Sequence, residues 1–400
     1  MRKLLGILTA CSALLWAGSD AAARTWYITS DGAGDAPTIQ AGIDSAHTGD
    51  VIELAPGTYR GEGNRDIEYH HAPVTVRSAT GNPADCIIDC EGSPSDLHRG
   101  FNFNLGETAT SILEAVTITH GMHYQGGGIH CENSSPRIQD CVLIDNTAIG
   151  SMYSDGGGMY CFRASPVVVN CLFENNRAAG PSGAGGGAAC EGYVEATFED
   201  CIFKSNVAEG GYGGGVVGVF MDTYVMIRGC LFYDNHADIQ GGALWCGSNI
   251  SVRFDLDGCT LAHNSAPTGS GIFYRPGSSG GESPVIARSI IALGQVGGAI
   301  YCDGYATVLD IGCTDLRGNE GGDWTGCIAD QYGVNGNFSA DPLFCDPDLG
   351  DFTLRSDSPC LPGNHPDGAD CGLIGAFVEG CEGSISTEYM SWGGLKAMFH

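Results

Sequence analysis

The chain has 400 residues, and its 47 Asp and Glu against 18 Lys and Arg give a formal net charge of −29. So acidic a chain argues against a nucleic-acid partner, because phosphate binding requires clustered Lys and Arg. The acidity would suit a calcium-rich exterior, so Ca²⁺ is a ligand to test, although the sequence assigns no metal site and acidity alone also serves solubility.

The N-terminus has the features of a secretory signal peptide, predicted over residues 1–23. A basic start and an apolar run at residues 4–18 precede small residues at 21–23. A lipoprotein anchored at Cys11 is the rival interpretation, but the apolar run continues past that cysteine, which favours an ordinary signal peptide. Since no later stretch is long and apolar enough to span a membrane, we expect a secreted or cell-surface protein without a transmembrane segment.

Residues 24–71 are predicted to form an N-terminal cap and the first strands. The segment around residues 38–46 has the apolar spacing of a short amphipathic helix, and a strand at residues 51–54 and a Pro-Gly turn follow it. Because the open end of a β-structure is an exposed edge, we expect this helix to cover the first turn of the fold.

Residues 72–303 contain a repeat with a period of 28–30 residues. A Gly-Gly-x group followed by an apolar residue recurs, and two further apolar columns keep the same period. Three apolar columns predict three short strands per turn, and stacking of like turns buries them. The predicted fold is therefore all-β, a parallel β-helix solenoid. Turn geometry and amide hydrogen bonds along the axis explain a column of asparagines, namely Asn146, Asn176, Asn206, Asn235 and Asn264.

The glycine groups stop after residue 303. Residues 304–380 are predicted to form irregular closing turns, and residues 381–400 a C-terminal tail that would serve as a sorting or docking element.

The cysteines of the repeat fall in pairs within one turn. In one turn Tyr274 and Ser289 stand at the two cysteine positions, so both members of the pair are lost together. In another turn Gly218 stands at the first position while Cys230 keeps the second, which breaks this pattern. Loss of Cys11 with the signal peptide leaves an even number of cysteines, which in an exported protein favours disulfides. Bridges between neighbouring turns and buried free thiols are the alternatives. The predicted within-turn disulfides are Cys131/Cys141, Cys161/Cys171, Cys190/Cys201, Cys246/Cys259 and Cys302/Cys313.

A second pattern lies on side chains predicted to point out of the solenoid. Alternation after each Gly-Gly-x group turns Ile129 and Cys131 inward and their neighbour outward. Exposed aromatic rings beside carboxylates are typical of sugar-binding surfaces, although aromatic residues also suit strands and a loop would hide them. The predicted ligand-binding face comprises His130, Tyr160, Trp245, Phe273 and Tyr301, followed by Glu132, Phe162, Glu191, Arg275 and Asp303.

Three histidines, His120, His123 and His130, lie close together in the sequence and raise the question of a metal site. His120 occupies the turn position that Asn146 fills in the next turn, so we interpret it as a turn residue and assign no metal.

Several segments resemble known repeats. "GGAL" (241–244) and "GGAI" (297–300), with "FENN" (173–176) and "FKSN" (203–206), resemble repeats of polymorphic outer-membrane proteins. "TIQAGIDSAHTGDVIELAPGTY" is similar to the entry segment of the pectate-lyase-like superfamily, and "SADPLFCDPDLGDFTLRSDSPC" to its closing segment. The resemblance, closest to a bacterial secreted class, implies a right-handed parallel β-helix with a short N-terminal capping helix.

This superfamily includes lyases, hydrolases, epimerases and adhesins, so the resemblance specifies the fold better than the activity. Its lyases generally use acidic calcium ligands with an Arg or Lys base. Its hydrolases show Asn-Thr-Asp, Asp-Asp, Gly-His-Gly and Arg-Ile-Lys segments, none of which occurs in this sequence. We therefore predict a non-catalytic protein that binds a polysaccharide or another surface along its long face. A polysaccharide lyase or glycoside hydrolase acting on acidic glycans, and a structural envelope component, are the alternatives.

Overall fold

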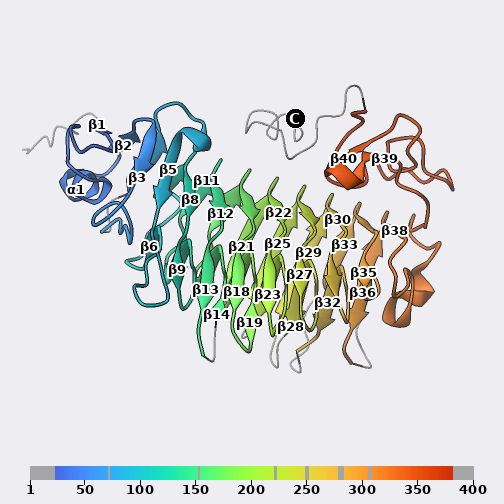
Figure 1. The fold of residues 1–400 in the computed structure, drawn as a ribbon. Helices are drawn as coiled ribbons and strands as arrows, with labels where there is room; N and C mark the ends of the chain where they lie inside the picture. The colour runs from blue at the N-terminus through green and yellow to red at the C-terminus, as the bar shows by residue number, and fades with distance from the viewer. Residues whose placement is uncertain are drawn as a thin grey trace, which may run out of the picture.

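A computed structural model describes residues 23–70, 73–151, 154–219, 223–247, 252–277, 283–304 and 309–381. The predicted signal peptide, apart from residue 23, the lipoprotein cysteine Cys11 and the tail beyond residue 381 lie outside these ranges. The described chain forms an elongated solenoid in which short strands from successive turns stack into long parallel sheets (Figure 1).

In the repeat, sheets II and I carry the first and the second strand after each Gly-Gly-x group. Within the described residues, sheet I has eleven strands: β1 (Thr25–Ile28), β2 (Val51–Leu54), β4 (Thr75–Ser78), β7 (Ile112–Glu114), β11 (Arg137–Gln139), β16 (Val167–Val169), β21 (Glu195–Glu199), β25 (Thr223–Arg228), β29 (Val252–Asp257), β33 (Val285–Ala287) and β37 (Asp310–Gly312). Sheet II has eight over the same ranges: β6 (Phe101–Phe103), β10 (Ile129–Glu132), β15 (Met159–Phe162), β20 (Ala188–Glu191), β24 (Val216–Val219), β28 (Leu244–Gly247), β32 (Ile272–Arg275) and β36 (Ile300–Cys302).

The remaining long sheets complete each turn. Sheet III contains, among the described residues, β3 (Gly57–Tyr59), β5 (Cys86–Asp89), β8 (Thr117–Thr119), β12 (Val142–Ile144), β17 (Leu172–Glu174), β22 (Ile202–Lys204), β26 (Leu231–Tyr233), β30 (Thr260–Ala262), β34 (Ile290–Ala292) and β38 (Asp315–Arg317). Sheet IV contains β9 (Met122–His123), β13 (Thr147–Ile149), β18 (Arg177–Ala179), β23 (Val207–Glu209), β27 (His236–Ala237), β31 (Ser265–Ala266) and β35 (Gln295–Val296).

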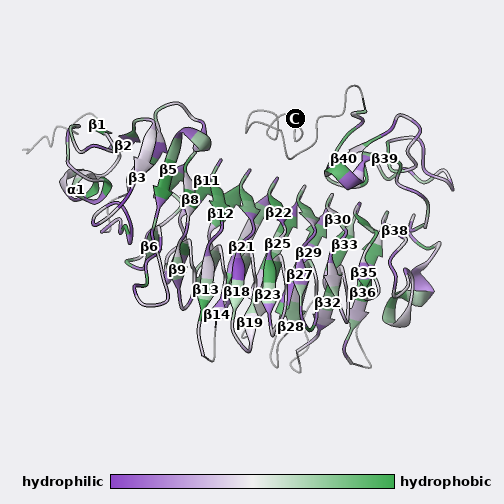
Figure 2. Ribbon diagram, viewed as in Figure 1, coloured by the Kyte–Doolittle hydropathy of each residue, from purple (hydrophilic) through white to green (hydrophobic). Residues whose placement is uncertain are grey.

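The core consists of like residues stacked along the axis. Buried and half-buried residues alternate along strands such as β10 and β29, and hydrophobic and hydrophilic segments are mixed along the solenoid (Figure 2). The rings of Phe173, Phe203 and Phe232 stack with centroids 4.6 and 4.7 Å apart. The predicted asparagine ladder is present: Asn176 Nδ2 donates to Asn206 Oδ1 at 3.0 Å, and Asn206 Nδ2 to Asn235 Oδ1 at 2.9 Å. The parallel β-helix that the repeat predicts is therefore confirmed.

The N-terminal helix α1 (Ile39–Ser45) begins after Thr38, whose hydroxyl accepts a hydrogen bond from the amide of Ala41. Its buried Ile39 and Ile43 join the solenoid core. A short 3₁₀ turn, η1 (Pro83–Asp85), precedes β5.

The cysteines require a correction, because none of the five predicted within-turn disulfides forms. In four of the five predicted pairs both members are buried free thiols, so the predicted bridges are wrong for Cys131 and Cys141, Cys161 and Cys171, Cys190 and Cys201, and Cys246 and Cys259. The physical reason is that the two cysteines of one turn belong to two separate columns, and each stacks on the corresponding residue of the next turn.

The two columns of thiols have different surroundings. In sheet II, Cys131 pairs in register with Cys161 of the next turn. At the corner before sheet III, the amide of Cys141 donates to Cys171 Sγ at 3.4 Å. Further along the same corner, Cys259 N–H donates to Ser289 Oγ at 3.2 Å. The Cys171 thiol and the Ser289 hydroxyl therefore occupy equivalent positions, in which each accepts a hydrogen bond from a backbone amide of the preceding turn.

Disulfides occur instead where the closing section, residues 318–381, folds against the last turns. Cys302 pairs with Cys327, so the predicted Cys302/Cys313 bridge is wrong. The remaining described disulfides are Cys313–Cys371 and Cys345–Cys381.

The closing section packs on the outer face of sheet III. Phe352 and Phe377 contribute to an apolar cluster with Leu231 and Ile290 of that sheet. Besides the 3₁₀ turns η2 (Gly326–Gln331) and η3 (Pro347–Leu349), it contains the antiparallel pair β39 (Phe344–Asp346) and β40 (Asp351–Leu354).

Candidate functional site

The predicted outward columns lie on the outer face of sheet II in the expected register. His130 of β10 pairs with Tyr160 of β15, and Trp245 of β28 pairs with Phe273 of β32. The neighbouring rings stack, with the Trp245 and Phe273 centroids 5.8 Å apart and the planes 2° from parallel.

Most of these rings are nevertheless buried, so the prediction of a long exposed aromatic face is wrong. Tyr160, Trp245 and Phe273 are only 3%, 6% and 0% exposed. The reason is that the loops leading into the strands of sheet II pair with one another in parallel and cover its outer face. This covering ladder includes β14 (Ser154–Asp155) and β19 (Gly183–Ala184). Tyr212, in this ladder, packs against Trp245.

The other predicted residues are dispersed along the sheet. Tyr301, in the last strand, is 45% exposed. Arg275 and Asp303 form an ion pair with Nε and Oδ2 2.6 Å apart, and Phe162 packs at the edge of the covered aromatic cluster. Glu191 accepts a hydrogen bond from Tyr160, described below. These residues do not converge on one site.

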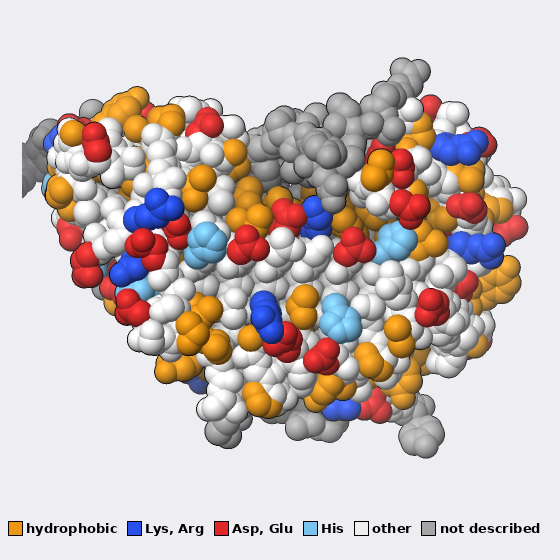
Figure 3. Space-filling view, in the orientation of Figure 1, with side chains coloured by type: hydrophobic (Ala, Val, Ile, Leu, Met, Phe, Trp, Pro, Cys, Tyr) orange, Lys and Arg blue, Asp and Glu red, His pale blue; other side chains and the backbone are white. Residues whose placement is uncertain are grey.

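His130 and Glu132 instead line an open pocket of about 450 Å³ at the N-terminal end of sheet II. On the face shown in Figure 3, charged side chains of both signs and histidines gather over this end of the solenoid, around β6 and β8. The residues lining this N-terminal pocket are Asp66, Glu68, Arg99, Asn102, Asn104, His123, Tyr124, Gln125, His130 and Glu132.

Backbone pairing brings these residues together from distant parts of the chain. Ile67 pairs with Phe101 as an isolated parallel bridge, which extends sheet II beyond β6. Glu68, Asn102 and His130 consequently stand on neighbouring turns with side chains on the same face.

A chain of hydrogen bonds fixes the imidazole of His130. Asn102 Nδ2 donates to Glu68 Oε1 at 2.8 Å, which leaves Asn102 Oδ1 to accept from His130 Nδ1 at 3.0 Å. Burial, with the charge of Arg99 as the next cause, lowers the pKa of His130 to about 3. His130 is therefore a neutral imidazole at neutral pH, with its proton on Nδ1 and an acceptor at Nε2.

A second fixed group is the pair of Arg99 and His123. Because a guanidinium can only donate, the contact between Arg99 Nη2 and His123 Nδ1 makes that nitrogen the acceptor. Burial and then Arg99 lower the pKa of His123 to about 4, and burial lowers the pKa of Arg99 to about 10. Asp66 holds this end of the pocket, since it accepts from the Arg99 amide at 2.9 Å and lies 2.6 Å from His98 Nδ1.

Two buried carboxyl groups adjoin the pocket. Gln125 Nε2 donates to Asp155 Oδ2 at 3.5 Å, and Tyr160 Oη donates to Glu191 Oε2 at 2.8 Å. Burial, followed by the charge of Glu191, raises the pKa of Asp155 to about 7, and burial also raises the pKa of Glu191. Asp155 belongs to β14 of the covering ladder and Glu191 to β20 of sheet II, and neither lines the pocket.

Of the three histidines that raised the question of a metal, His123 and His130 line the same pocket and His120 does not. His120 lies at a different corner, with its Nδ1 3.0 Å from Asp89 Oδ1. Its φ of 53° fits a turn residue, but it takes the position of Asp145 in the next turn and not that of Asn146, because Thr119 pairs with Ile144. Within the described residues, no group of three or more His, Cys, Asp and Glu side chains is arranged to hold a metal ion.

Sequence reasoning missed eight of the ten lining residues, because they precede or flank the first clear Gly-Gly-x turn. One signal was available: Asn102 and Asn104 stand 28 residues before His130 and Glu132, so the outward columns extend one turn further back.

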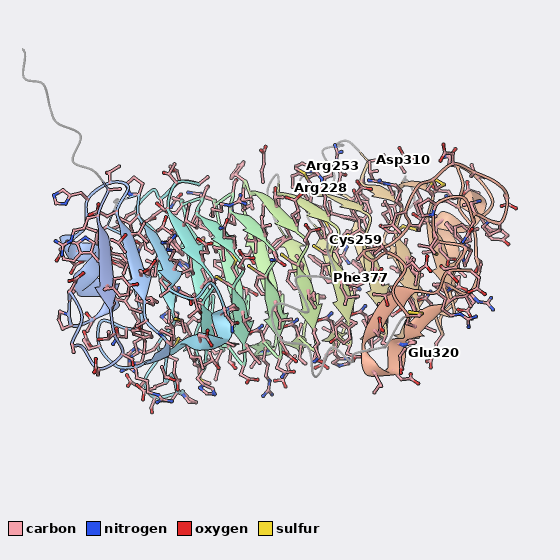
Figure 4. The ribbon with its side chains drawn as sticks, turned by 90° about the horizontal axis from the view of Figure 1, so that it is seen from above. Arg228, Arg253, Cys259, Asp310, Glu320 and Phe377 are labelled. Atoms are coloured by element: carbon pink, nitrogen blue, oxygen red, sulfur yellow. A yellow bond between two sulfur atoms is a disulfide. The ribbon has the colours of Figure 1, made fainter. Side chains whose placement is uncertain are left out.

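A second pocket of about 370 Å³ lies on sheet I, and the two carboxylates that line it, Asp255 and Asp257, are engaged in ion pairs. Arg288 binds Asp257 through Nε at 2.9 Å, and Arg253 Nη2 lies 2.7 Å from Asp255 Oδ2. Figure 4 places Arg228 and Arg253 on one side of the solenoid and Glu320 on the opposite side.

Comparison with solved structures identifies the hand of the solenoid. The chain is similar to pectate lyase Pel9A, with a TM-score of 0.50 and 14% sequence identity over 90% of this chain and 97% of that chain. The fold is a right-handed parallel β-helix. A likeness to the PL6 family alginate lyase AlyGC is weaker, with a TM-score of 0.35 and 11% identity over 80% and 54% of the two chains.

At such low identities these likenesses show the fold alone. No family model matches the sequence, and no curated protein does. Among the described residues, no helix is long and apolar enough to cross a membrane.

Proposed function

We propose that this chain is a secreted or cell-surface protein that binds a polysaccharide in the N-terminal pocket. The observation that supports this most directly is that the pocket combines the ring of Tyr124, which is 59% exposed, with planar polar side chains in fixed orientations. Sugar rings stack on such aromatic faces while their hydroxyls bond to amides, imidazoles and carboxylates.

The pocket is largely pre-formed, which lowers the entropic cost of binding. Glu68 holds Asn102, Asn102 holds His130, and Arg99 holds His123. A polymer would continue from the pocket along the solenoid surface. The three disulfides of the closing section are consistent with an oxidising, extracellular environment.

Cleavage of the bound polysaccharide is the second candidate function. It is favoured by Arg99, a guanidinium in the pocket with its pKa lowered to about 10, and by the similar fold of a protein named as a pectate lyase. Against it, the two imidazoles have pKa values of about 3 and 4 and are weak bases at neutral pH. Binding is therefore the function that the geometry supports better.

A depletion assay tests this proposal. Residues 24–400 are incubated with pectate, alginate and neutral glucans, xylans and mannans, with and without calcium, while chain length and unsaturated products are followed. We expect one polymer to be depleted without being shortened, and Tyr124→Ala to weaken that binding by about three- to tenfold.

The matched control is Tyr332→Ala, because Tyr332 is 58% exposed and lies in the closing section, outside the pocket. Shortened chains would establish cleavage in place of simple binding. Absence of any depletion would refute the proposal and leave a structural role for the solenoid.

A further inference from the structure

We propose that the N-terminal pocket selects uncharged sugar units and excludes uronates, with Glu132 as the selecting residue. This inference rests on the proposed function, since it names the class of saccharide that the same pocket takes.

The charged side chains that line the pocket are mostly carboxylates. Its walls include the carboxylates of Asp66, Glu68 and Glu132, while Arg99 is the only Lys or Arg among the described lining residues. His123 and His130 add no positive charge at neutral pH, because burial and Arg99 hold their pKa values at about 4 and 3. The pocket is therefore net negative.

The Arg99 guanidinium is not free to bind a ligand carboxylate. Arg99 is only 7% exposed, and its Nη2 contacts His123. Its positive charge is also compensated by Asp66, which accepts from the Arg99 amide and contributes a favourable charge interaction. An incoming carboxylate would have to displace these contacts before it paired with the guanidinium.

Glu132 is the carboxylate that remains available. Asp66 and Glu68 are already engaged with His98 and Asn102. The Glu132 side chain is half-buried in the wall and has no polar partner within the part of the chain that the structure describes. A carboxylate in that state accepts hydrogen bonds from neutral sugar hydroxyls, and it repels a uronate at the same distance.

Matched ligands separate the effect of charge from that of sugar shape. Oligosaccharides from pectate and from alginate are compared with their carboxyl-reduced forms, in which each carboxylate has become a hydroxymethyl group, alongside neutral gluco-, xylo- and manno-oligosaccharides. Dissociation constants are measured in 0.5 M NaCl, in which the Debye length is about 4–5 Å, so that charges of the chain far from the pocket are largely screened.

We expect uncharged oligosaccharides to bind at least about tenfold more tightly than their uronate counterparts. Glu132→Gln keeps the shape of the side chain and removes its charge. It should lower the ratio of the uronate dissociation constant to the uncharged one by about threefold or more. Asp348→Asn is the matched control, because Asp348 is an exposed carboxylate in η3, and it should leave the ratio unchanged.

Equal or tighter binding of uronates would overturn the inference while leaving polysaccharide binding intact. A preference for uncharged sugars that Glu132→Gln does not alter would also overturn it, because the selectivity would then arise elsewhere. If no oligosaccharide bound at all, the proposed function itself would fail, and the inference would fail with it.

Discussion

The asparagine ladder gives the sharpest stability prediction, and Asn206→Ala tests it. Asn206 is fully buried, and its Oδ1 accepts from the backbone amide and from Nδ2 of Asn176, both at 3.0 Å. Its Nδ2 donates to the Phe173 carbonyl and to Asn235 Oδ1, both at 2.9 Å. Alanine removes all four hydrogen bonds of this side chain.

The magnitude follows from the groups that lose their partners. The Asn176 amide loses its acceptor and the Phe173 carbonyl loses a donor, both inside the core. A buried polar group without a partner costs about 1–3 kcal/mol, so the two together predict a loss of about 2–6 kcal/mol in unfolding free energy.

Urea unfolding followed by far-ultraviolet circular dichroism measures this loss. Glu195→Ala is the control, because its exposed side chain lies in the same turn, and it should change the free energy by less than about 0.5 kcal/mol. A loss below about 1 kcal/mol for Asn206→Ala would refute the reasoning, since it would mean that the ladder contributes no more than an ordinary surface contact.

Three further predictions concern titration and thiols. A thiol reagent should label the twelve free cysteines of the described chain only after denaturation, because all are buried; rapid labelling of the native protein would contradict their placement. Asp155→Asn should stabilise the protein by about 1–3 kcal/mol at pH 8 and less at pH 5, because burial raises the Asp155 pKa to about 7 and ionisation above that value destabilises the fold; equal effects at both pH values would contradict this. His123 and His130 should stay neutral at pH 6 in imidazole nitrogen spectra, and their contribution to stability should be lost as pH falls from about 6.5 towards their folded pKa values; resonances titrating near pH 6.5 would show that these rings are exposed.

The repeat predicted the fold because each turn must present like residues to the next. Asn146 and Asn176 recur with the Gly-Gly-x groups, and that period is sufficient to indicate a β-helix. Sheet IV was not predicted, because its strands have only two or three residues and bury small side chains such as Ala178 and Ala208. A short alanine column carries little periodic signal.

The cysteine pairing was not predictable from spacing alone. Two cysteines in one turn, such as Cys131 and Cys141, also arise when each belongs to a separate stacked column. Ser289 shows that the corner column selects a group that bonds to the backbone rather than a disulfide partner. Cys302 and Cys313 pair with the closing section, whose path the repeat does not encode.

The candidate site was predicted only at His130 and Glu132. The outward direction of the aromatic columns was inferred from alternation, which distinguishes the core from the outer face but not an open face from a covered one. The loops that bury Tyr160 and Trp245 lie outside the apolar columns, and the pocket itself depends on Arg99 and Asn102, which come from earlier turns.

Histidine-selective NMR of residues 24–400 tests the central claim most directly, because it reports which part of the protein a ligand reaches. During titration with an uncharged oligosaccharide from the depleted polymer, the account predicts shifts of the His123 and His130 resonances, with those of His236 and His365 unchanged. Saturable binding that leaves His123 and His130 unshifted would contradict it, since the saccharide would then occupy a surface other than the N-terminal pocket.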